Sequence, residues 1–119
     1  MKILKKILGG SFLILILILV SNFEVQRVNG SSMEPTLQDK QFIIIQLTKN
    51  IKIGDIVTIH INYEYGSKSE YIIKRVADID KDGNIYVLGD NSEISHDSRH
   101  YGYIPGDMVQ GKLIYSFKN

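Results

Sequence analysis

The chain has 119 residues, enough for one modest hydrophobic core, and no cysteine, which excludes disulfides, thiolate nucleophiles and cysteine-ligated zinc. Its net charge of +1 hides an asymmetry, because residues 1–23 carry three lysines and no acid, whereas residues 24–119 carry eleven bases and thirteen acids. The larger part lacks the basic surplus with which nucleic-acid-binding domains neutralise phosphates, so we expect no nucleic-acid partner.

The N-terminal segment has the composition of a membrane anchor. After the lysines an uncharged run extends from Ile7 to Phe23, and a helix of that length spans roughly 25 Å, the short end of what crosses a bilayer. A cleaved signal peptide has the same basic start and apolar middle, but no Ala-x-Ala-like pair of small residues follows Val20, which favours a retained anchor. The lysines before the span put the N-terminus in the cytoplasm. We therefore expect an anchor, residues 1–23, and an extracytoplasmic domain, residues 24–119.

The remainder has short stretches of β-forming residues divided by turn signals, and no long helical period. Strands are predicted over Gln41–Thr48, Asp55–Tyr63, Glu70–Ile79, Ile85–Asp90 and Gly111–Phe117. Turn residues separate them in "KNIKIG", "EYGSKS" and "DKDGN", and the Asp-Gly pair of the last is the strongest hairpin signal in the chain. The predicted fold class is mainly β: a small antiparallel sheet or barrel-like domain on one N-terminal transmembrane helix.

Two adjacent serines, Ser31 and Ser32, follow the apolar segment in "NGSSMEPTL". Pro35 has a fixed φ and keeps Glu34 out of the helical region, and Gly30 permits tight geometry before the serines. Such a turn can hold a hydroxyl in place, although the same residue types also make ordinary turns. A serine hydroxyl becomes a good nucleophile only where a neighbouring group removes its proton, so the chain must also supply a base.

Lys74 is one candidate base. The period of two in a strand places it on one face together with Ile72 and Val76. If that face is buried, desolvation lowers the pKa of the lysine, as a general base requires. The more ordinary alternative is an edge lysine whose ammonium group reaches water.

The histidines are weaker candidates. His60 alternates with Thr58 and Asn62 on a polar face, which indicates a solvated strand residue. His96 and His100, in "HDSRH", have the spacing of a helical zinc motif, but loop-forming residues surround them, so we expect neither a helix nor a metal there.

Four segments in order resemble the conserved boxes of bacterial-type signal peptidase I, a membrane-anchored serine protease with a Ser-Lys dyad. They are "VNGSSMEPTL", "KIGDIVTI", "YIIKRV" and "GDNSEISHDSR", and "YGYIPGDMVQGK" continues as in family members. The resemblance implies that Ser32, directly before the methionine, is the nucleophile and that Lys74 is the general base. It further implies that Ser95 contacts the base and that Asp97 and Arg99 brace the site. Without the resemblance, the last two would be an ordinary surface pair on a loop.

The same resemblance implies the chemistry and the partners. Neutral Lys74 takes the proton of Ser32, and the Ser32 backbone N–H stabilises the oxyanion of an exported preprotein substrate. We expect a monomer in contact with membrane lipid, in the cell membrane, with a shallow apolar groove for small residues and with no cofactor or metal. Ser32 follows the span closely enough to lie near the membrane surface.

The chain departs from the family at several points. "ADIDKDG" replaces the usual Gly-Leu-Pro-Gly-Asp type sequence after Val76, and Ser92 stands where an arginine is common. Only twelve residues separate Val76 from Gly89, too few for the large inserted β-domain of longer relatives. Gly30 has no hydroxyl to serve as a second oxyanion donor. Two alternatives therefore stay open: a self-cleaving repressor-like Ser-Lys protease, which would not carry the apolar segment, and a catalytically inactive, membrane-tethered β-module that binds exported proteins.

Overall fold

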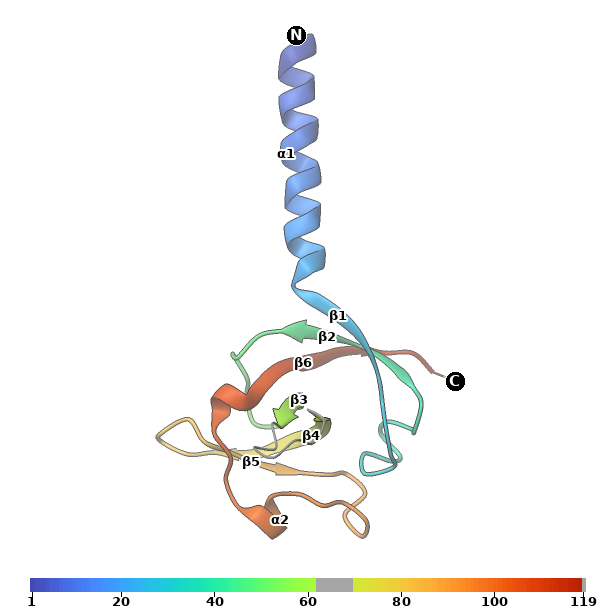
Figure 1. Ribbon diagram of the computed structural model, residues 1–119, viewed down its shortest axis with the longest axis vertical. Coiled ribbons are helices and arrows are strands. Elements are labelled where there is room, and N and C mark those ends of the chain that lie inside the picture. Colours follow the sequence, from blue (N-terminus) through green and yellow to red (C-terminus); the bar gives the residue numbers. More distant parts are fainter. Residues whose placement is uncertain (62–69, 119) are drawn as a thin grey trace.

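A computed structural model describes residues 1–61 and 70–118 (Figure 1). Helix α1 comes first, and the other described residues form six strands with a single helical turn, α2, and a short 3-10 helix, η1, before the last strand. The elements are α1 (Lys2–Ser21), β1 (Phe23–Arg27), β2 (Phe42–Leu47), β3 (Ile56–Ile61), β4 (Glu70–Ile79), β5 (Ile85–Leu88), α2 (Ser98–Tyr101), η1 (Gly106–Met108) and β6 (Val109–Ser116).

The strands form one antiparallel sheet in the order β1-β2-β6-β3-β4-β5, so β1 and β5 are its two edges. Figure 1 shows β1, β2 and β6 as the layer next to α1, with β3, β4, β5 and α2 on the far side of the domain. The predicted mainly β class with one N-terminal apolar helix is confirmed. The Asp82-Gly83 hairpin is also confirmed, because antiparallel β4 and β5 meet there and Gly83 has φ 83°.

Most predicted strands coincide with observed ones, with shifts at the ends. β4 has the predicted bounds, whereas β5 stops at Leu88 and β6 begins at Val109. The end of the predicted Asp55–Tyr63 strand and the "EYGSKS" turn lie outside the described residues. β1 was not predicted, because its five residues directly follow the apolar run and no turn signal separates the two segments.

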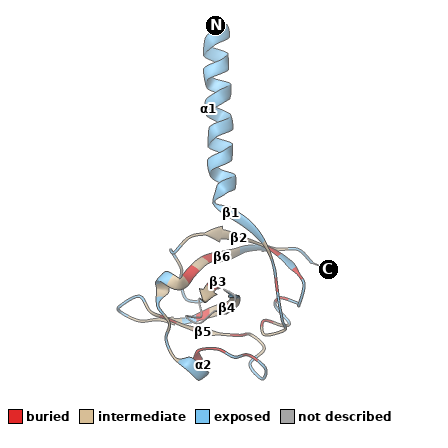
Figure 2. Ribbon diagram, in the orientation of Figure 1, coloured by how far each residue is buried: buried red, intermediate tan, exposed pale blue. Residues whose placement is uncertain are grey.

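The apolar helix is longer at its start and shorter at its end than the predicted span. α1 begins at Lys2 and ends at Ser21, and Asn22 connects it to β1, so Phe23 belongs to the sheet. No residue of α1 is buried, and its apolar side chains are exposed along its whole length (Figure 2). By length and composition α1 can cross a membrane, a test that an N-terminal signal sequence also passes.

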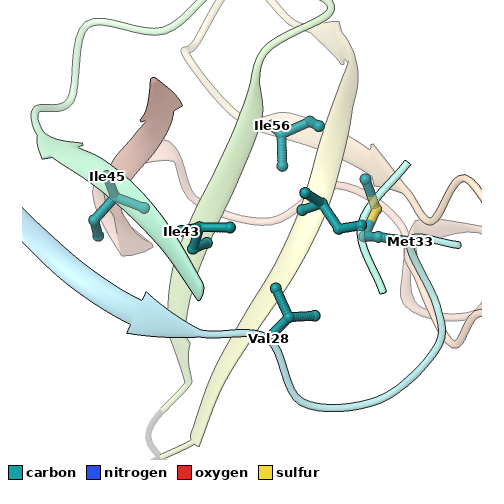
Figure 3. Packing of buried hydrophobic residues seen from close by; sticks show 6 residues of the cluster. Val28, Met33, Ile43, Ile45 and Ile56 are labelled. Carbon is teal, nitrogen blue, oxygen red and sulfur yellow. The ribbon is translucent and has the colours of Figure 1, made fainter. Parts of the chain in front are cut away.

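Two buried clusters give the domain its core. The first packs Val28, Met33, Leu37, Ile43, Ile45 and Ile56 (Figure 3), and the second packs Val57, Ile59, Val76, Ile85, Val87 and Val109. Met33 and Leu37 come from the loop between β1 and β2, so the first cluster fixes this loop against the sheet. The second cluster fixes β4 between its neighbours. The two clusters hold the segments that carry the serine and the lysine.

Candidate active site

The serine turn is held from both sides. Met33, directly after Ser32, is buried in the first cluster. On the polar side, the Asn91 backbone N–H donates to the Ser32 carbonyl at 2.8 Å, and its side-chain amide donates to the Ser31 carbonyl at 3.1 Å. Gly30 has φ 91° and donates its N–H to Asp39 at 2.7 Å. These contacts fix the backbone of Ser32, so its hydroxyl has little freedom beyond rotation about χ1.

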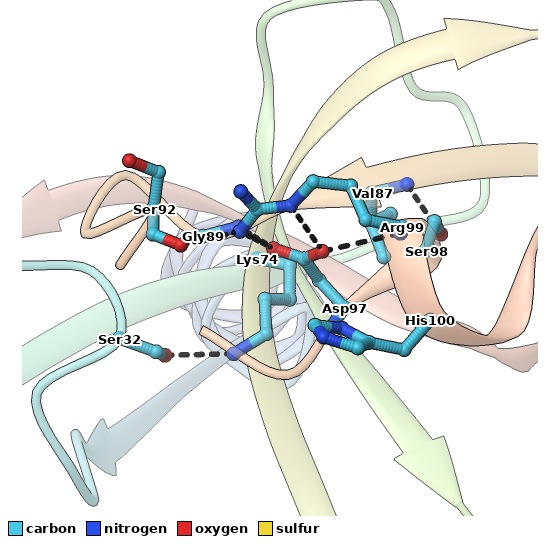
Figure 4. Close-up of polar contacts among 9 residues, drawn as sticks. All are labelled: Ser32, Lys74, Val87, Gly89, Ser92, Asp97, Ser98, Arg99 and His100. Atoms are coloured by element: carbon cyan, nitrogen blue, oxygen red, sulfur yellow. Dashed lines mark hydrogen bonds and ion pairs between the residues drawn. The ribbon is translucent and has the colours of Figure 1, made fainter. Parts of the chain in front are cut away.

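The structure brings Lys74 onto this hydroxyl. Lys74 Nζ is hydrogen-bonded to Ser32 Oγ at 2.7 Å (Figure 4), although the two residues are 42 positions apart. The Lys74 residue is only 6% exposed, with Val76 buried and Ile72 half-buried on the same strand, as the period of two predicts. Burial lowers the pKa of Lys74 below its ordinary 10.5, and the nearby Asp97 carboxylate opposes this by raising it. A lysine in this environment is able to accept a proton at lower pH than a surface lysine.

Asp97 is fully buried, with 0% exposure, and accepts hydrogen bonds from two directions. Arg99 donates Nε and Nη2 to its two oxygens at 3.0 Å each, and the Gly89 N–H donates at 2.9 Å. Burial by itself raises the pKa of Asp97, but the hydrogen bonds from Arg99 and Gly89, together with the nearby Ser95 hydroxyl, outweigh it and hold the pKa well below the usual range. Asp97 is therefore an ionised carboxylate inside the domain, near Lys74 rather than in water.

Asp97 also begins α2. Its side chain accepts from the Arg99 N–H at 3.2 Å, and His100 Nδ1 accepts from the Asp97 N–H at 3.4 Å, which makes a capping box. The buried Ser98 hydroxyl accepts from the Val87 N–H at 2.8 Å and so attaches α2 to β5 (Figure 4). The sequence-based expectation of no helix in "HDSRH" was wrong, because these local caps stabilise a single turn that hydrophobic periodicity does not reveal.

Ser95 is buried near Ser32 and Lys74, but its hydroxyl forms no hydrogen bond with any described residue. It influences the pKa of Asp97, which places it near that carboxylate. Ser95 makes no hydrogen bond with Lys74 in this arrangement, and the expected contact between them stays a prediction. The absence of a side chain at Gly89 allows Ser95 and the Ser32 carbonyl to pack against the backbone at this position. A Cβ there would lie 2.1 Å from Ser95 Oγ and 2.7 Å from the Ser32 carbonyl oxygen.

Sequence reasoning missed a second network beside the site. Arg75 donates Nε and Nη2 to Asp90 at 2.9 and 2.7 Å and Nη1 to the Gly54 carbonyl at 2.9 Å. The Thr36 hydroxyl donates to the same Asp90 carboxylate at 2.5 Å. Arg75 follows Lys74, and Thr36 lies in the serine turn, so Asp90 links the segments that carry Lys74 and Ser32. The sequence did offer a signal for this network, because Thr36, Arg75 and Asp90 all lie inside the segments that resemble the family's boxes.

None of the three histidines forms a hydrogen bond with Ser32 or Lys74 in the described part of the chain. His60 is half-buried and its ring lies 4.8 Å from that of Tyr71 across β3 and β4, while Thr58 is buried, so the predicted solvated polar face was wrong. The rings of His96 and His100 stack at 4.7 Å on the exposed side of α2. Within residues 1–61 and 70–118, no three His, Asp or Glu side chains are grouped to hold a metal ion.

A groove of about 480 Å³ opens from Ser32 and Lys74 and runs between β1 and β4. Its β4 side includes Tyr71, Ile72 and Ile73, and Val28 and Met33 lie near the serine. β5 pairs with β4 only from Arg75 onward, so within residues 1–61 and 70–118 the first half of β4 has no strand partner on that side. The groove is therefore bordered by backbone as well as by apolar side chains.

The fold and the site together define a class: a β-domain on an apolar helix, with a fixed serine hydroxyl against a buried lysine, as in serine proteases that use lysine as the base. The family model described as signal peptidase, peptidase S26, matches residues 1–82 and 79–117, and the chain belongs to this family. The resemblance drawn from the four boxes is thereby confirmed. Family membership makes the chain a hydrolase of the signal peptidase type.

Individual relatives agree with this assignment. Signal peptidase IB of Staphylococcus aureus (strain COL) is 24% identical over 171 aligned positions that cover 98% of this chain and 90% of the relative. Mitochondrial inner membrane protease subunit 1 is 25% identical in Schizosaccharomyces pombe, covering 77% of this chain and 71% of the relative, and 29% identical in mouse, covering 76% and 67%. These similarities and α1 together indicate association with a membrane.

Proposed function

We propose that this protein is a membrane-anchored serine endopeptidase that removes N-terminal signal peptides from exported preproteins, with Ser32 as nucleophile and Lys74 as general base. The observation that carries the proposal is the 2.7 Å contact between the serine hydroxyl and the amine of a lysine that is 6% exposed. A surface lysine would be protonated at neutral pH and could accept no proton. Burial disfavours the ammonium form, so the amine is available as a base.

The geometry supports the following reaction. Neutral Lys74 accepts the proton of Ser32 as Oγ attacks the scissile carbonyl, and the Ser32 N–H stabilises the tetrahedral oxyanion. Protonated Lys74 then gives its proton to the leaving amine, and an acyl-enzyme remains. The lysine next takes a proton from water, which attacks the ester and releases the signal peptide's new carboxylate. Asp97 stabilises the ammonium form between these steps, because it raises the pKa of Lys74 while burial lowers it.

The free edges beside the groove support binding of an extended peptide. β1 is an edge strand of the sheet, and no other described strand pairs with Glu70–Lys74 of β4 on the side away from β3. A substrate strand between them would gain backbone hydrogen bonds on both sides, and its side chains would alternate toward and away from the groove floor. Val28 and Met33 close the floor near Ser32, which suits a small apolar residue before the cut.

The proposed topology follows from the two ends of α1. Its three lysines lie at the start of the helix, so the N-terminus faces the cytoplasm and residues 24–119 form an extracytoplasmic domain. We place the anchor in the cell membrane and expect the enzyme to act as a monomer, with no nucleic-acid partner. Ser95, Asp97 and Arg99 are proposed as supporting residues rather than as groups that touch the substrate.

The test is processing of a preprotein reporter by the full-length protein in membranes and in detergent. Ser32→Ala and Lys74→Ala are each expected to reduce cleavage by about 10³-fold or more, because the dyad acts as a unit. Ser31→Ala is the matched control and should retain activity. Folding is checked by circular dichroism. Unchanged processing by a folded Ser32→Ala protein would overturn the proposal, and a folded wild-type chain that binds but never cleaves preproteins would favour the inactive β-module.

A further inference from the structure

The groove beside Ser32 changes in character along its length. Near the serine it is apolar, because Val28 and Met33 line it there. Farther back along β1, the residues that line it include Gln26 and Glu24. The end of the groove away from the serine therefore presents polar side chains to a bound peptide.

Strand register explains why these two polar residues face the inside of the sheet. Glu24 pairs with Ile45 and Gln26 pairs with Ile43, and both isoleucines are 0% exposed in the first core cluster. Directly paired residues of antiparallel strands place their side chains on the same face. Glu24 and Gln26 thus lie on the core side of β1, whereas Val25 between them is exposed on the other side.

A chain of hydrogen bonds joins them to the strands beneath. Gln26 Nε2 donates to Gln110 Oε1 at 2.9 Å, and the hydroxyl of Thr58, which is buried, donates to the same oxygen at 3.3 Å. Gln110 Nε2 in turn donates to Glu24 Oε2 at 3.2 Å. Residues of β1, β3 and β6 therefore form one polar network under the groove.

The carboxylate determines the direction of every hydrogen bond in this network. A carboxylate only accepts, so Gln110 must turn its amide nitrogen toward Glu24 and its oxygen toward Gln26. Gln26 must then present its own nitrogen to that oxygen, which leaves Gln26 Oε1 as an acceptor. No described residue donates to Gln26 Oε1 or to Glu24 Oε1. The network consequently offers acceptors, and no donors, to the groove.

Two other charged residues line the same part of the groove. Arg27 alternates to the outward side of β1, where its guanidinium lies 5.5 Å from the centre of the Phe42 ring. Four antiparallel pairings separate β1 from β4, so the two strands run in the same direction and Glu70 lies at the same end as Glu24. The end of the groove away from the serine is therefore acidic as well as rich in acceptors.

The proposed function places the residue before the cut over Val28. The preceding residues of the substrate extend toward Glu24, because β4 is paired with β5 from Arg75 onward. An extended peptide directs alternate side chains to the same face and rises about 3.3 Å per residue, as β1 does. Val28 and Gln26 are two positions apart, so the third residue before the cut lies over Gln26.

We infer that the groove selects preproteins whose third residue before the cut carries a hydrogen-bond donor, with lysine as the best fit; this inference rests on the proposed protease function. An ammonium group has donors for both Gln26 Oε1 and Glu24 Oε1. An aliphatic side chain would cover these acceptors without a hydrogen bond, which costs free energy. A glutamate at the same position would be repelled by Glu24 and Glu70.

The first experiment measures binding and does not depend on cleavage. The full-length Ser32→Ala protein in detergent is titrated into fluorescent peptides that have alanine before the cut and lysine, norleucine or glutamate at the third position before it. Norleucine matches the chain length of lysine without the charge. Fluorescence anisotropy should show about tenfold tighter binding of the lysine peptide than of the norleucine peptide, and the weakest binding of the glutamate peptide. Equal affinities of the three peptides would overturn the inference.

Two further variants, each added to Ser32→Ala, assign the preference to the network. Gln26→Leu removes one free acceptor and should abolish most of the preference for lysine over norleucine. Gln46→Leu is the matched control, because Gln46 pairs with Phe23 on the outward side of the sheet and should keep the preference. Glu24→Gln keeps the side-chain volume and removes the charge, so it should reduce the preference severalfold even if Gln26→Leu fails to fold. An unchanged preference in folded Glu24→Gln protein would contradict the inference.

The second experiment repeats the comparison with the active enzyme. The kcat/KM of the lysine peptide should exceed that of the norleucine peptide by about the same factor as in binding. Cleavage of both peptides at equal kcat/KM would contradict the selectivity and leave the protease function standing. An inactive wild-type protein that still binds the lysine peptide more tightly would contradict the protease function and support the acceptor network.

Discussion

The active-site region and the exposed surface of β1, β2 and the end of β6 both reverse the ordinary distribution of residues, in opposite directions. Around Ser32, a lysine and an aspartate are buried, whereas on β1, β2 and β6 phenylalanine and tyrosine side chains are exposed. Buried charges cost free energy unless hydrogen bonds and partners compensate them inside the domain. Exposed apolar groups cost solubility and are compensated only by another phase or molecule. The first region therefore depends on the chain's own fold, and the second on its surroundings.

The largest expected effect comes from replacing the buried amine by an apolar group of similar length. Lys74→Met should reduce cleavage by about 10³-fold or more, because no base remains. It should also raise the free energy of unfolding by about 1 kcal/mol at neutral pH, as is common where a functional site is strained.

This expected increase in the free energy of unfolding follows from the lowered pKa of Lys74, because burial disfavours the charged amine in the folded state. Between that pKa and 10.5 the unfolded chain binds the extra proton, so the stability of the wild type rises with pH in this window. The Met variant lacks this rise. Urea denaturation at several pH values measures it, with Lys81→Met on an exposed turn as control. A Met variant that is less stable at every pH would show that the lysine is not disfavoured by burial.

The contribution of the buried Asp97 carboxylate to the stability of the domain can be measured by replacing it. Asp97→Ala should lower the free energy of unfolding by about 3 kcal/mol, because the Gly89 N–H loses its acceptor and α2 loses its cap. Its low pKa makes this contribution present above the unfolded value of about 4 and lost as pH falls through the lower folded value. Denaturation from pH 7 to pH 2 measures both effects. Asp82→Ala, at an exposed turn, should stay within about 0.5 kcal/mol of the wild type.

Gly89 tests how closely the site is packed. In Gly89→Ala the added methyl would lie 2.1 Å from Ser95 Oγ and 2.7 Å from the Ser32 carbonyl oxygen, so the serine turn must move. A displacement of this kind should lower kcat by about 10²-fold while the preprotein KM changes little. Steady-state kinetics with the neighbouring Ser92→Ala as control measure the split. A fully active Gly89→Ala enzyme would mean that the turn tolerates the shift.

The smallest expected effect is a displacement of the pH profile. Activity should rise with pH as Lys74 loses its proton, with a midpoint below 10.5. Asp97 raises the pKa of Lys74, so Asp97→Asn should move the midpoint of kcat/KM to lower pH. Asp107→Asn, on exposed η1, is the control and should leave the profile in place. A shift to higher pH in Asp97→Asn would contradict the proposed electrostatic contact.

Sequence patterns predicted the local features well. Alternation along β4 placed Lys74 on one face with Ile72 and Val76, and the Asp82-Gly83 pair marked the β4–β5 hairpin, because both features depend on neighbours in the chain. β1 was missed because a strand that follows an apolar run directly has no turn signal to separate it. α2 was missed because its caps are side-chain contacts within one turn, too short for a hydrophobic period.

The sequence by itself determined an apolar helix that can cross a membrane, a set of antiparallel strands and a serine and a lysine in recognisable boxes. Only the tertiary structure decided that Lys74 Nζ meets Ser32 Oγ, that Asp90 joins Thr36 to Arg75, and that large apolar side chains such as Phe42 and Tyr115 are exposed on the sheet. Composition and periodicity are properties of short segments. Distances across 42 residues and the exposure of a sheet face depend on which strands become neighbours, and that is settled only when the whole core packs.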